Sequence, residues 1–178
     1  MIRGCSHATR TISRRQIFDI SFTSKDPVPK NAIGDEPLLI KAEIGGAIVH
    51  RIYVDGGSST EIMYDHCFQL LNDTQKATMQ PPTTPLVGFA GQQLWPMCVI
   101  TLSLTLNDYQ GKGNMTIKVE FMVVRAPSPY NVILGRTRLN KLGAIASTIH
   151  LLIKFPIPSG IATVLGDTPC IKGCMHTS

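Results

Sequence analysis

The 178-residue sequence contains no apolar run that approaches the ~18 residues needed for a membrane-spanning helix. Charged residues are also few, at 16% of the chain, whereas 43% of the residues are hydrophobic. This balance is typical of a chain with a folded core and excludes one that is disordered over most of its length. We therefore expect a globular domain with no membrane partner.

Acidic residues are absent from the first 16 positions, which carry Arg3, Arg10, Arg14 and Arg15. Outside this stretch, 13 basic residues face 12 acidic residues, so the rest of the chain is nearly neutral. A nucleic-acid-binding domain carries its basic surface on the folded part, and we expect no nucleic acid to be bound by this domain. The N-terminal stretch also lacks the apolar segment of a secretory signal. Its composition favours a disordered linker over an organelle transit peptide.

The cysteines lack the pattern of a disulfide framework. Five are present, and an odd number without a secretory signal predicts reduced thiols in the cytosol or nucleus. Cys170, Cys174 and His176 form a C-x3-C-x-H pattern, but three ligands are fewer than the four of a structural zinc site. We therefore expect no metal ion and no cofactor, and we interpret residues 168–178 as a flexible tail.

Long helices are not expected, because twelve prolines and fifteen glycines divide the sequence into short elements. Strands are expected where apolar residues cluster or alternate, at 38–44, 47–54, 97–106, 115–124, 148–155 and 161–166. The Gly45-Gly46 pair between the first two strands predicts a hairpin turn, because glycine readily takes the positive φ that such turns need. Helical spacing predicts short helices at 60–71 and 136–145, and a loop at 126–135 ends in one more apolar strand. This pattern predicts an all-β barrel or sandwich with one or two short helices.

An acidic turn, Asp55-Gly56-Gly57-Ser58-Ser59, follows the second of these strands. Taken alone, it fits an ordinary turn, and glycines before a helix also fit an anion site. No GxxxxGK(S/T) motif follows, and the acid would repel a phosphate. The two serines lack a recognisable His and Asp partner for nucleophilic catalysis.

Four segments in this order resemble retroviral-type (retropepsin-like) aspartic proteases. The segments are RIYVDGGSSTEIMYDHCF, LVGFAG, SPYNVILGRTRLNKLGAIAST and IHLLIKFPIPSGIATVLGD. They look like the protease region of plant Ty3/Gypsy LTR-retrotransposon polyproteins. The resemblance implies a closed acid-protease barrel that is half of a two-fold dimer. It divides the chain into a basic, disordered linker at 1–36, a protease domain at 37–167 and the tail at 168–178.

The resemblance also implies roles for individual residues. Asp55 would activate water together with the same residue of a second chain, in an aspartic endopeptidase that cleaves extended peptides of a polyprotein. Gly57 would shape the turn, and Ser58 is a candidate hydrogen-bond partner. The resemblance further implies a substrate-binding flap, formed by Gly88, Phe89, Ala90 and Gly91, and Trp95 adds apolar surface near it. It also implies a structural apolar-Gly element, formed by Ile133, Leu134 and Gly135. A retroelement particle in the cytoplasm is the implied location.

One position departs from the family pattern. Gly56 stands where these proteases carry a Thr or Ser whose hydroxyl braces the two catalytic turns of the dimer. Two hypotheses therefore remain. The chain is either an active endopeptidase or an inactive dimeric remnant that acts as a structural or peptide-binding module.

Overall fold

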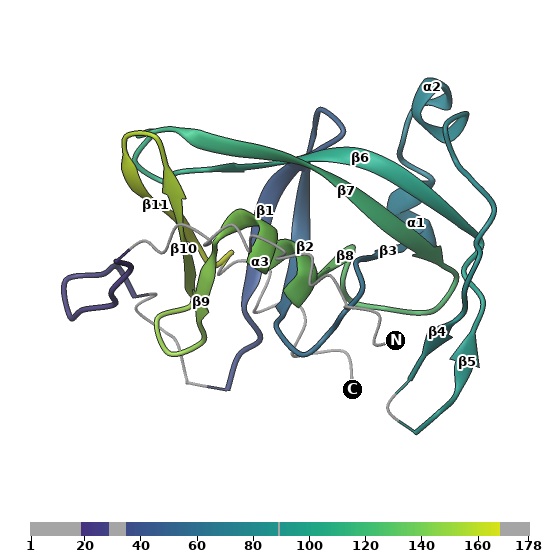
Figure 1. The fold of residues 1–178 in the computed structure, drawn as a ribbon, viewed down its shortest axis with the longest axis horizontal. Helices are drawn as coiled ribbons and strands as arrows, with labels where there is room; N and C mark the ends of the chain where they lie inside the picture. The colour runs from purple at the N-terminus through teal and green to yellow at the C-terminus, as the bar shows by residue number, and fades with distance from the viewer. Residues whose placement is uncertain (1–18, 29–34, 89, 168–178) are drawn as a thin grey trace, which may run out of the picture.

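A closed β-barrel forms the centre of the protein (Figure 1). The computed structural model describes residues 19–28, 35–88 and 90–167. The barrel has the strand order β1-β2-β8-β3-β7-β6. Its strands are β1 (Leu39–Ile44), β2 (Ala47–Asp55), β3 (Ile62–Tyr64), β6 (Cys98–Asn107), β7 (Asn114–Val124) and β8 (Val132–Gly135). The prediction of an all-β barrel with few short helices is confirmed.

The core of the barrel follows from the alternation of apolar residues in its longest strands. Side chains of a strand point alternately to opposite faces, so Ile100, Leu102, Leu104 and Leu106 of β6 all point inward and are buried. Phe121 of β7 is also fully buried. The two strands pair along their whole length and form the long hairpin at the top of Figure 1.

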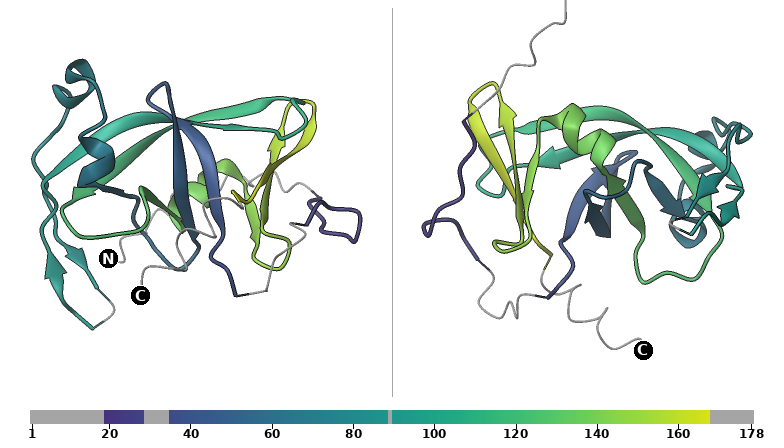
Figure 2. Two further views of the ribbon diagram at one scale, coloured as in Figure 1. Left: turned by 180° about the vertical axis from the view of Figure 1, so that it is seen from behind. Right: turned by 60° about the horizontal axis from the view of Figure 1, so that its bottom comes forward.

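Two smaller sheets lie at opposite ends of the molecule in Figure 1 and in both views of Figure 2. One is the hairpin of β4 (Leu86–Val87) and β5 (Gln93–Leu94). The other contains β9 (Ile145–Ser147), β10 (Leu152–Ile157) and β11 (Gly160–Leu165) in the order β11-β10-β9. The helices are short: α1 (Asp65–Phe68), α2 (Asp73–Lys76) and α3 (Arg136–Leu142).

Asp108 joins the three-stranded sheet to the barrel. It follows β6 directly and is buried, with an exposed fraction of 6%. Its Oδ1 accepts a hydrogen bond from the Thr163 N–H at 2.7 Å, and its Oδ2 accepts from the N–H groups of Gln110 at 2.9 Å and Lys112 at 3.1 Å. Burial alone would raise the pKa of Asp108, but the three N–H donors outweigh it and lower the pKa.

The predicted helix at 60–71 is wrong in its first part. Residues 62–64 form β3, which pairs in parallel with β7 and antiparallel with β8. Their spacing fits a helix, but their backbone groups complete the closed barrel, and this tertiary pairing outweighs local propensity. The helix that remains, α1, has four residues.

Smaller boundary errors have similar causes. The predicted helix at 136–145 ends at Leu142, because Gly143 takes the left-handed conformation (φ 62°) that terminates helices. Ile145 then begins β9. The strand predicted at 148–155 begins at Leu152, and α2 was not among the predicted helices.

The segment 19–28 contacts β10, although it lies within the stretch expected to be a linker. Lys154 Nζ donates a hydrogen bond to the Ser21 carbonyl at 2.7 Å and forms an ion pair with Asp26 Oδ1 at 2.6 Å. The Phe22 ring stacks on His150 with the ring centroids 5.5 Å apart. The domain limits at 36 and 167 stay a prediction.

In the described ranges, no helix is long and apolar enough to cross a membrane. The same part of the chain holds no group of three or more His, Cys, Asp or Glu side chains arranged to bind a metal ion. Cys67 and Cys98 are buried free thiols, and burial raises the pKa of both. Residues 1–18 and the pattern of Cys170, Cys174 and His176 lie outside the described residues.

Candidate active site

Asp55 is the last residue of β2, which pairs in parallel with β8 in the barrel. The register runs from Ile52 opposite Val132 to Asp55 opposite Gly135. Because neighbouring parallel strands end at the same edge of a sheet, the acidic turn and the apolar-Gly element lie side by side. The sequence resemblance pointed to both segments, and the fold brings them together.

The turn after β2 fixes the direction of the carboxylate. The Gly57 N–H donates a hydrogen bond to Asp55 Oδ1 at 2.9 Å, and the Ser58 N–H donates to the Asp55 carbonyl at 3.2 Å. A Cβ atom on Gly57 would lie 3.2 Å from Asp55 Oδ1, which is closer than an ordinary van der Waals contact. Asp55 is half-buried, and both Gly56 and Gly57 are exposed. The Gly57 N–H therefore orients the carboxylate, while the two glycines of the turn remain exposed.

Gly135 holds the turn against β8 and α3. A Cβ atom at this position would lie 2.8 Å from the Thr60 carbonyl oxygen and 2.9 Å from that of Ser58, so only glycine permits this approach. The Arg136 N–H donates to the Ser58 carbonyl at 2.8 Å. The Thr137 hydroxyl donates to the carbonyl of residue 59 at 3.0 Å. Strand β8 and helix α3 together thus define the path of residues 58–60.

The candidate partner Ser58 makes its side-chain hydrogen bonds within the turn. Its hydroxyl donates to the Thr60 carbonyl at 2.8 Å and accepts from the Thr60 N–H at 3.2 Å. At Gly56, a Cβ atom would meet no other atom within 4 Å. The chain therefore stabilises the turn with Ser58, while the space beside Asp55 at position 56 is open.

The expected flap is the β4–β5 hairpin, in which Leu86 pairs with Leu94. The Gly88 N–H donates to the Gln92 carbonyl at 2.7 Å, and Gly91 has the positive φ (82°) that favours glycine. The hairpin extends away from the barrel in Figure 1. It carries exposed apolar side chains, namely Val87, Leu94 and Trp95. Ala90 lies at the exposed tip, whereas Phe89 lies outside the described residues.

Asn131, which sequence reasoning did not select, joins three strands at the other end of β8. Its side-chain NH2 donates to the His50 carbonyl at 2.8 Å, and its backbone N–H donates to the Arg51 carbonyl at 3.0 Å. The Tyr64 N–H donates to the Asn131 carbonyl at 3.0 Å. The only feature of Asn131 in the sequence is that it is a polar residue before an apolar strand. Many loops share this feature, so it does not single out Asn131.

Sequence reasoning also missed an ion pair beside the turn. Glu61 follows the turn directly, and its Oε2 lies 3.3 Å from Nε of Arg138 in α3. The side chains are 5% and 20% exposed, respectively. The sequence around Glu61 gives no indication of its ion-pair partner Arg138, which lies 77 positions further along the chain.

Two cavities on the surface lie away from Asp55. One, of about 940 Å³, lies between α3 and the turn before β11; the other, of about 560 Å³, contains His50 and Asp167. His50 Nδ1 and Asp167 Oδ2 are 2.8 Å apart there. Asp55 lines neither cavity.

Comparison with known proteins identifies the fold. No family model matches the sequence, and no curated protein matches it. Among solved structures, the retroviral protease-like domain of Ddi1 from Leishmania major is similar, with a TM-score of 0.50 and 14% sequence identity. The similarity covers 72% of this chain and 94% of that domain. The chain therefore has a retropepsin-like protease fold, as the sequence resemblance predicted.

Proposed function

We propose that this chain is half of an aspartic endopeptidase and that Asp55 is its catalytic carboxylate. One observation supports this most strongly: an aspartate at the end of β2 is held by the Gly57 N–H beside the glycine that ends β8, within a barrel of the retroviral protease type. An ordinary turn does not require a glycine of a second strand to pack against two carbonyl oxygens of the turn. Here Gly135 makes that contact.

The chemistry requires a second carboxylate, which a two-fold homodimer supplies as the same residue of the partner chain. Two adjacent carboxyl groups share one proton and titrate as a unit. The ionised carboxylate takes a proton from water, which attacks the peptide carbonyl carbon, while the protonated carboxyl group polarises the carbonyl oxygen. The C–N bond then breaks, and the dyad gives a proton to the leaving amine. No metal ion or cofactor takes part in this proposal.

The β4–β5 hairpin is the proposed flap. An extended peptide would lie between it and Asp55 as an added strand, with alternate side chains facing the protein. The exposed Leu94 and Trp95 of the hairpin provide apolar contacts for such a peptide, and closure of the hairpin would exclude water from the reaction.

The three-stranded sheet provides support for a dimer. Within the described residues, the outer edge of β9 pairs with no other strand, and such edges pair readily with another chain. Ile145 in β9 and Ile149 in the turn after it are exposed, by 45% and 82% respectively. Both features favour a second copy as the partner.

The substrate class that we propose is a retrotransposon polyprotein of the plant Ty3/Gypsy type, cleaved in the cytoplasm within a retroelement particle. The support for this is the ordered set of sequence segments around Asp55, the flap and Gly135. The fold is consistent with such an enzyme and with many other members of the same fold class.

An inactive dimeric remnant is the second candidate, and Gly56 favours it. Without a hydroxyl at this position, the two turns of the dimer lack a cross-brace, and a misplacement on the order of 1 Å can reduce a rate about 100-fold. The remnant would retain the fold, the dimer and peptide binding without hydrolysis.

Peptide cleavage by the full-length chain separates the candidates. The chain is incubated with a library of extended peptides at pH values of about 4 to 6, where a shared-proton dyad is functional. We expect cleavage that a statine-type inhibitor blocks and that Asp55→Asn abolishes, with an unchanged melting temperature. Asp35→Asn, at an exposed position, is the matched control and should cleave normally.

Sedimentation of the same samples completes the experiment. A stable dimer that binds peptides but cleaves none would support the remnant. Cleavage that persists in Asp55→Asn would refute the assignment of the catalytic residue.

A further inference from the structure

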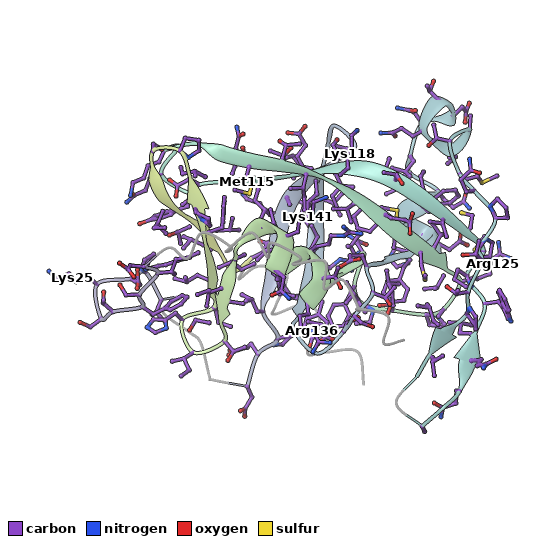
Figure 3. All side chains as sticks on the ribbon, viewed as in Figure 1. Lys25, Met115, Lys118, Arg125, Arg136 and Lys141 are labelled. Carbon is purple, nitrogen blue, oxygen red and sulfur yellow. The ribbon has the colours of Figure 1, made fainter. Side chains whose placement is uncertain are left out.

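The ion pair of Glu61 and Arg138 connects the two segments that build the proposed active site. Glu61 directly follows residues 58–60, which contact the start of α3, and its own carbonyl accepts a hydrogen bond from the Met122 N–H of β7 at 2.9 Å. Arg138 lies in α3 between Arg136 and Lys141, which are labelled along this helix in Figure 3. The ion pair therefore connects the segment after the turn to α3 through side chains, while Gly135 packs against the turn through its backbone.

The surroundings of this pair argue against a simple role in stability. Glu61 Oε1 and Arg138 Nε are buried, and neither makes a hydrogen bond. A buried ion pair with unmet hydrogen-bonding groups loses more solvation than it regains, so it rarely stabilises a fold. By contrast, the pair of Arg125 and Asp65 is exposed at its arginine, by 72%. The burial of this pair is therefore weak evidence for a role in stability.

The charge of Glu61 changes at a higher pH than that of an ordinary glutamate, because its pKa is raised. Burial raises its pKa and outweighs the opposing effect of the Arg138 guanidinium. Other charged groups lie on the elements around it, namely Asp55 at the end of β2, Arg136 and Lys141 on α3, and Lys118 and Glu120 on β7. Within the described residues, its one ion pair is with Arg138.

We propose that the Glu61–Arg138 ion pair is a positioning device for the catalytic turn, engaged when Glu61 is ionised and released when it is protonated. The proposal rests on the proposed function for its effect on cleavage. In the ionised state, the pair holds the segment after the turn against α3, and the turn holds Asp55. Protonation of Glu61 removes the attraction and leaves the backbone contacts of Gly135 and Arg136 to hold the turn alone.

This mechanism predicts that activity and stability change in opposite directions with pH. A carboxyl group with a raised pKa favours folding while it is protonated, and this contribution is lost as the pH rises through the raised pKa. Glu61→Gln stays neutral, so its melting temperature relative to the wild type should increase as the pH rises. Its kcat should fall relative to the wild type over the same range. A purely structural role would make activity follow stability.

The test compares the full-length wild type with Glu61→Gln and with Asp26→Asn. Asp26 forms the other well-buried ion pair, with Lys154, and it lies far from the turn along the chain. We expect the ratio of wild-type to Glu61→Gln kcat to rise from about 1 where Glu61 is protonated to about 10 where it is ionised, with KM within about twofold, since a misplaced group affects kcat. Asp26→Asn should stay within about twofold of the wild-type kcat at every pH. The dimer fraction is matched by sedimentation in all samples.

An NMR titration provides a readout that needs no cleavage. It uses Asp55→Asn, so that the dyad does not titrate, and follows the Arg136 amide and the carboxyl carbon of Glu61. We expect the amide shift to titrate with the same midpoint as the carboxyl group. If the wild type cleaves no peptide, the proposed function fails, and this titration alone decides the positioning device. A kcat ratio that is independent of pH, equal losses in Glu61→Gln and Asp26→Asn, or an Arg136 amide that does not follow Glu61 would each overturn the proposal.

Discussion

Replacement of Gly135 by alanine tests the most specific contact in the candidate site. The added Cβ atom would lie 2.8 Å and 2.9 Å from the carbonyl oxygens of Thr60 and Ser58, whereas ordinary contacts begin near 3.4 Å. The turn and β8 must therefore separate by about 0.5 Å, the difference between these distances. Both clashing atoms belong to the backbone, so a side-chain rotation cannot relieve the strain.

The size of the effect follows from this separation. Overpacking of a tight contact typically costs about 1–3 kcal/mol, and loss of the hydrogen bond from the Arg136 N–H to Ser58 adds about 1 kcal/mol. Urea denaturation should therefore show a free energy of unfolding that is lower by about 2–4 kcal/mol. In the cleavage assay, kcat should fall about tenfold or more, because the displacement is a substantial part of 1 Å.

Gly56→Ala is the matched control, since it adds the same methyl group one residue after Asp55. A Cβ atom there meets nothing within 4 Å, and Gly56 is not among the residues with positive φ. Its free energy of unfolding should stay within about 0.5 kcal/mol of the wild type. If Gly135→Ala is as stable as this control, the close approach of β8 to the turn is not as the structure describes it, and the reasoning fails.

Two further predictions concern the open position and the buried carboxylate. Gly56→Ser adds a hydroxyl beside Asp55 in open space. We expect unchanged stability and a kcat/KM raised about tenfold, because the hydroxyl would brace the two turns of the dimer. An unchanged kcat/KM would refute the brace. Asp108→Asn replaces one acceptor oxygen with a donor and should lower the free energy of unfolding at pH 7 by about 1–3 kcal/mol. Because the pKa of Asp108 is lowered, its contribution is present above the ordinary value of about 3.9 and is lost as the pH falls through the lowered pKa, so the difference between the two proteins should shrink below about pH 4. A difference that is constant with pH would show that the hydrogen bonds do not depend on the charge.

The sequence predicted the parts of the fold that local chemistry determines. Alternation of apolar residues gave β6 and β7, the Gly45-Gly46 pair gave the β1–β2 hairpin, and the strand ending at Asp55 was placed correctly. These elements depend on the two-residue period of strands and on the conformational freedom of glycine in turns. Both can be recognised without knowledge of the partner strands.

The errors arose where a distant partner determined the structure. Residues 62–64 have helical spacing, but they form β3 because β7 and β8 supply hydrogen-bonding partners on both sides. No window of sequence around Met63 contains this information. Likewise, Glu61 could be recognised as an acidic residue but not as a buried one, because its burial depends on α3.

The same distinction explains how the candidate site is built. A local motif can place a carboxylate at the end of a strand, but it cannot fix the direction of that carboxylate to the accuracy that catalysis needs. In this chain the direction depends on β8 and α3, which lie about eighty positions after Asp55 and contact the turn through Gly135, Arg136 and Arg138. Under the proposed function, cleavage therefore depends as much on the residues after β8 as on the turn itself. A substitution in α3 that leaves the sequence of the turn intact should alter cleavage, and Glu61→Gln and Gly135→Ala measure the side-chain and backbone parts of this dependence separately.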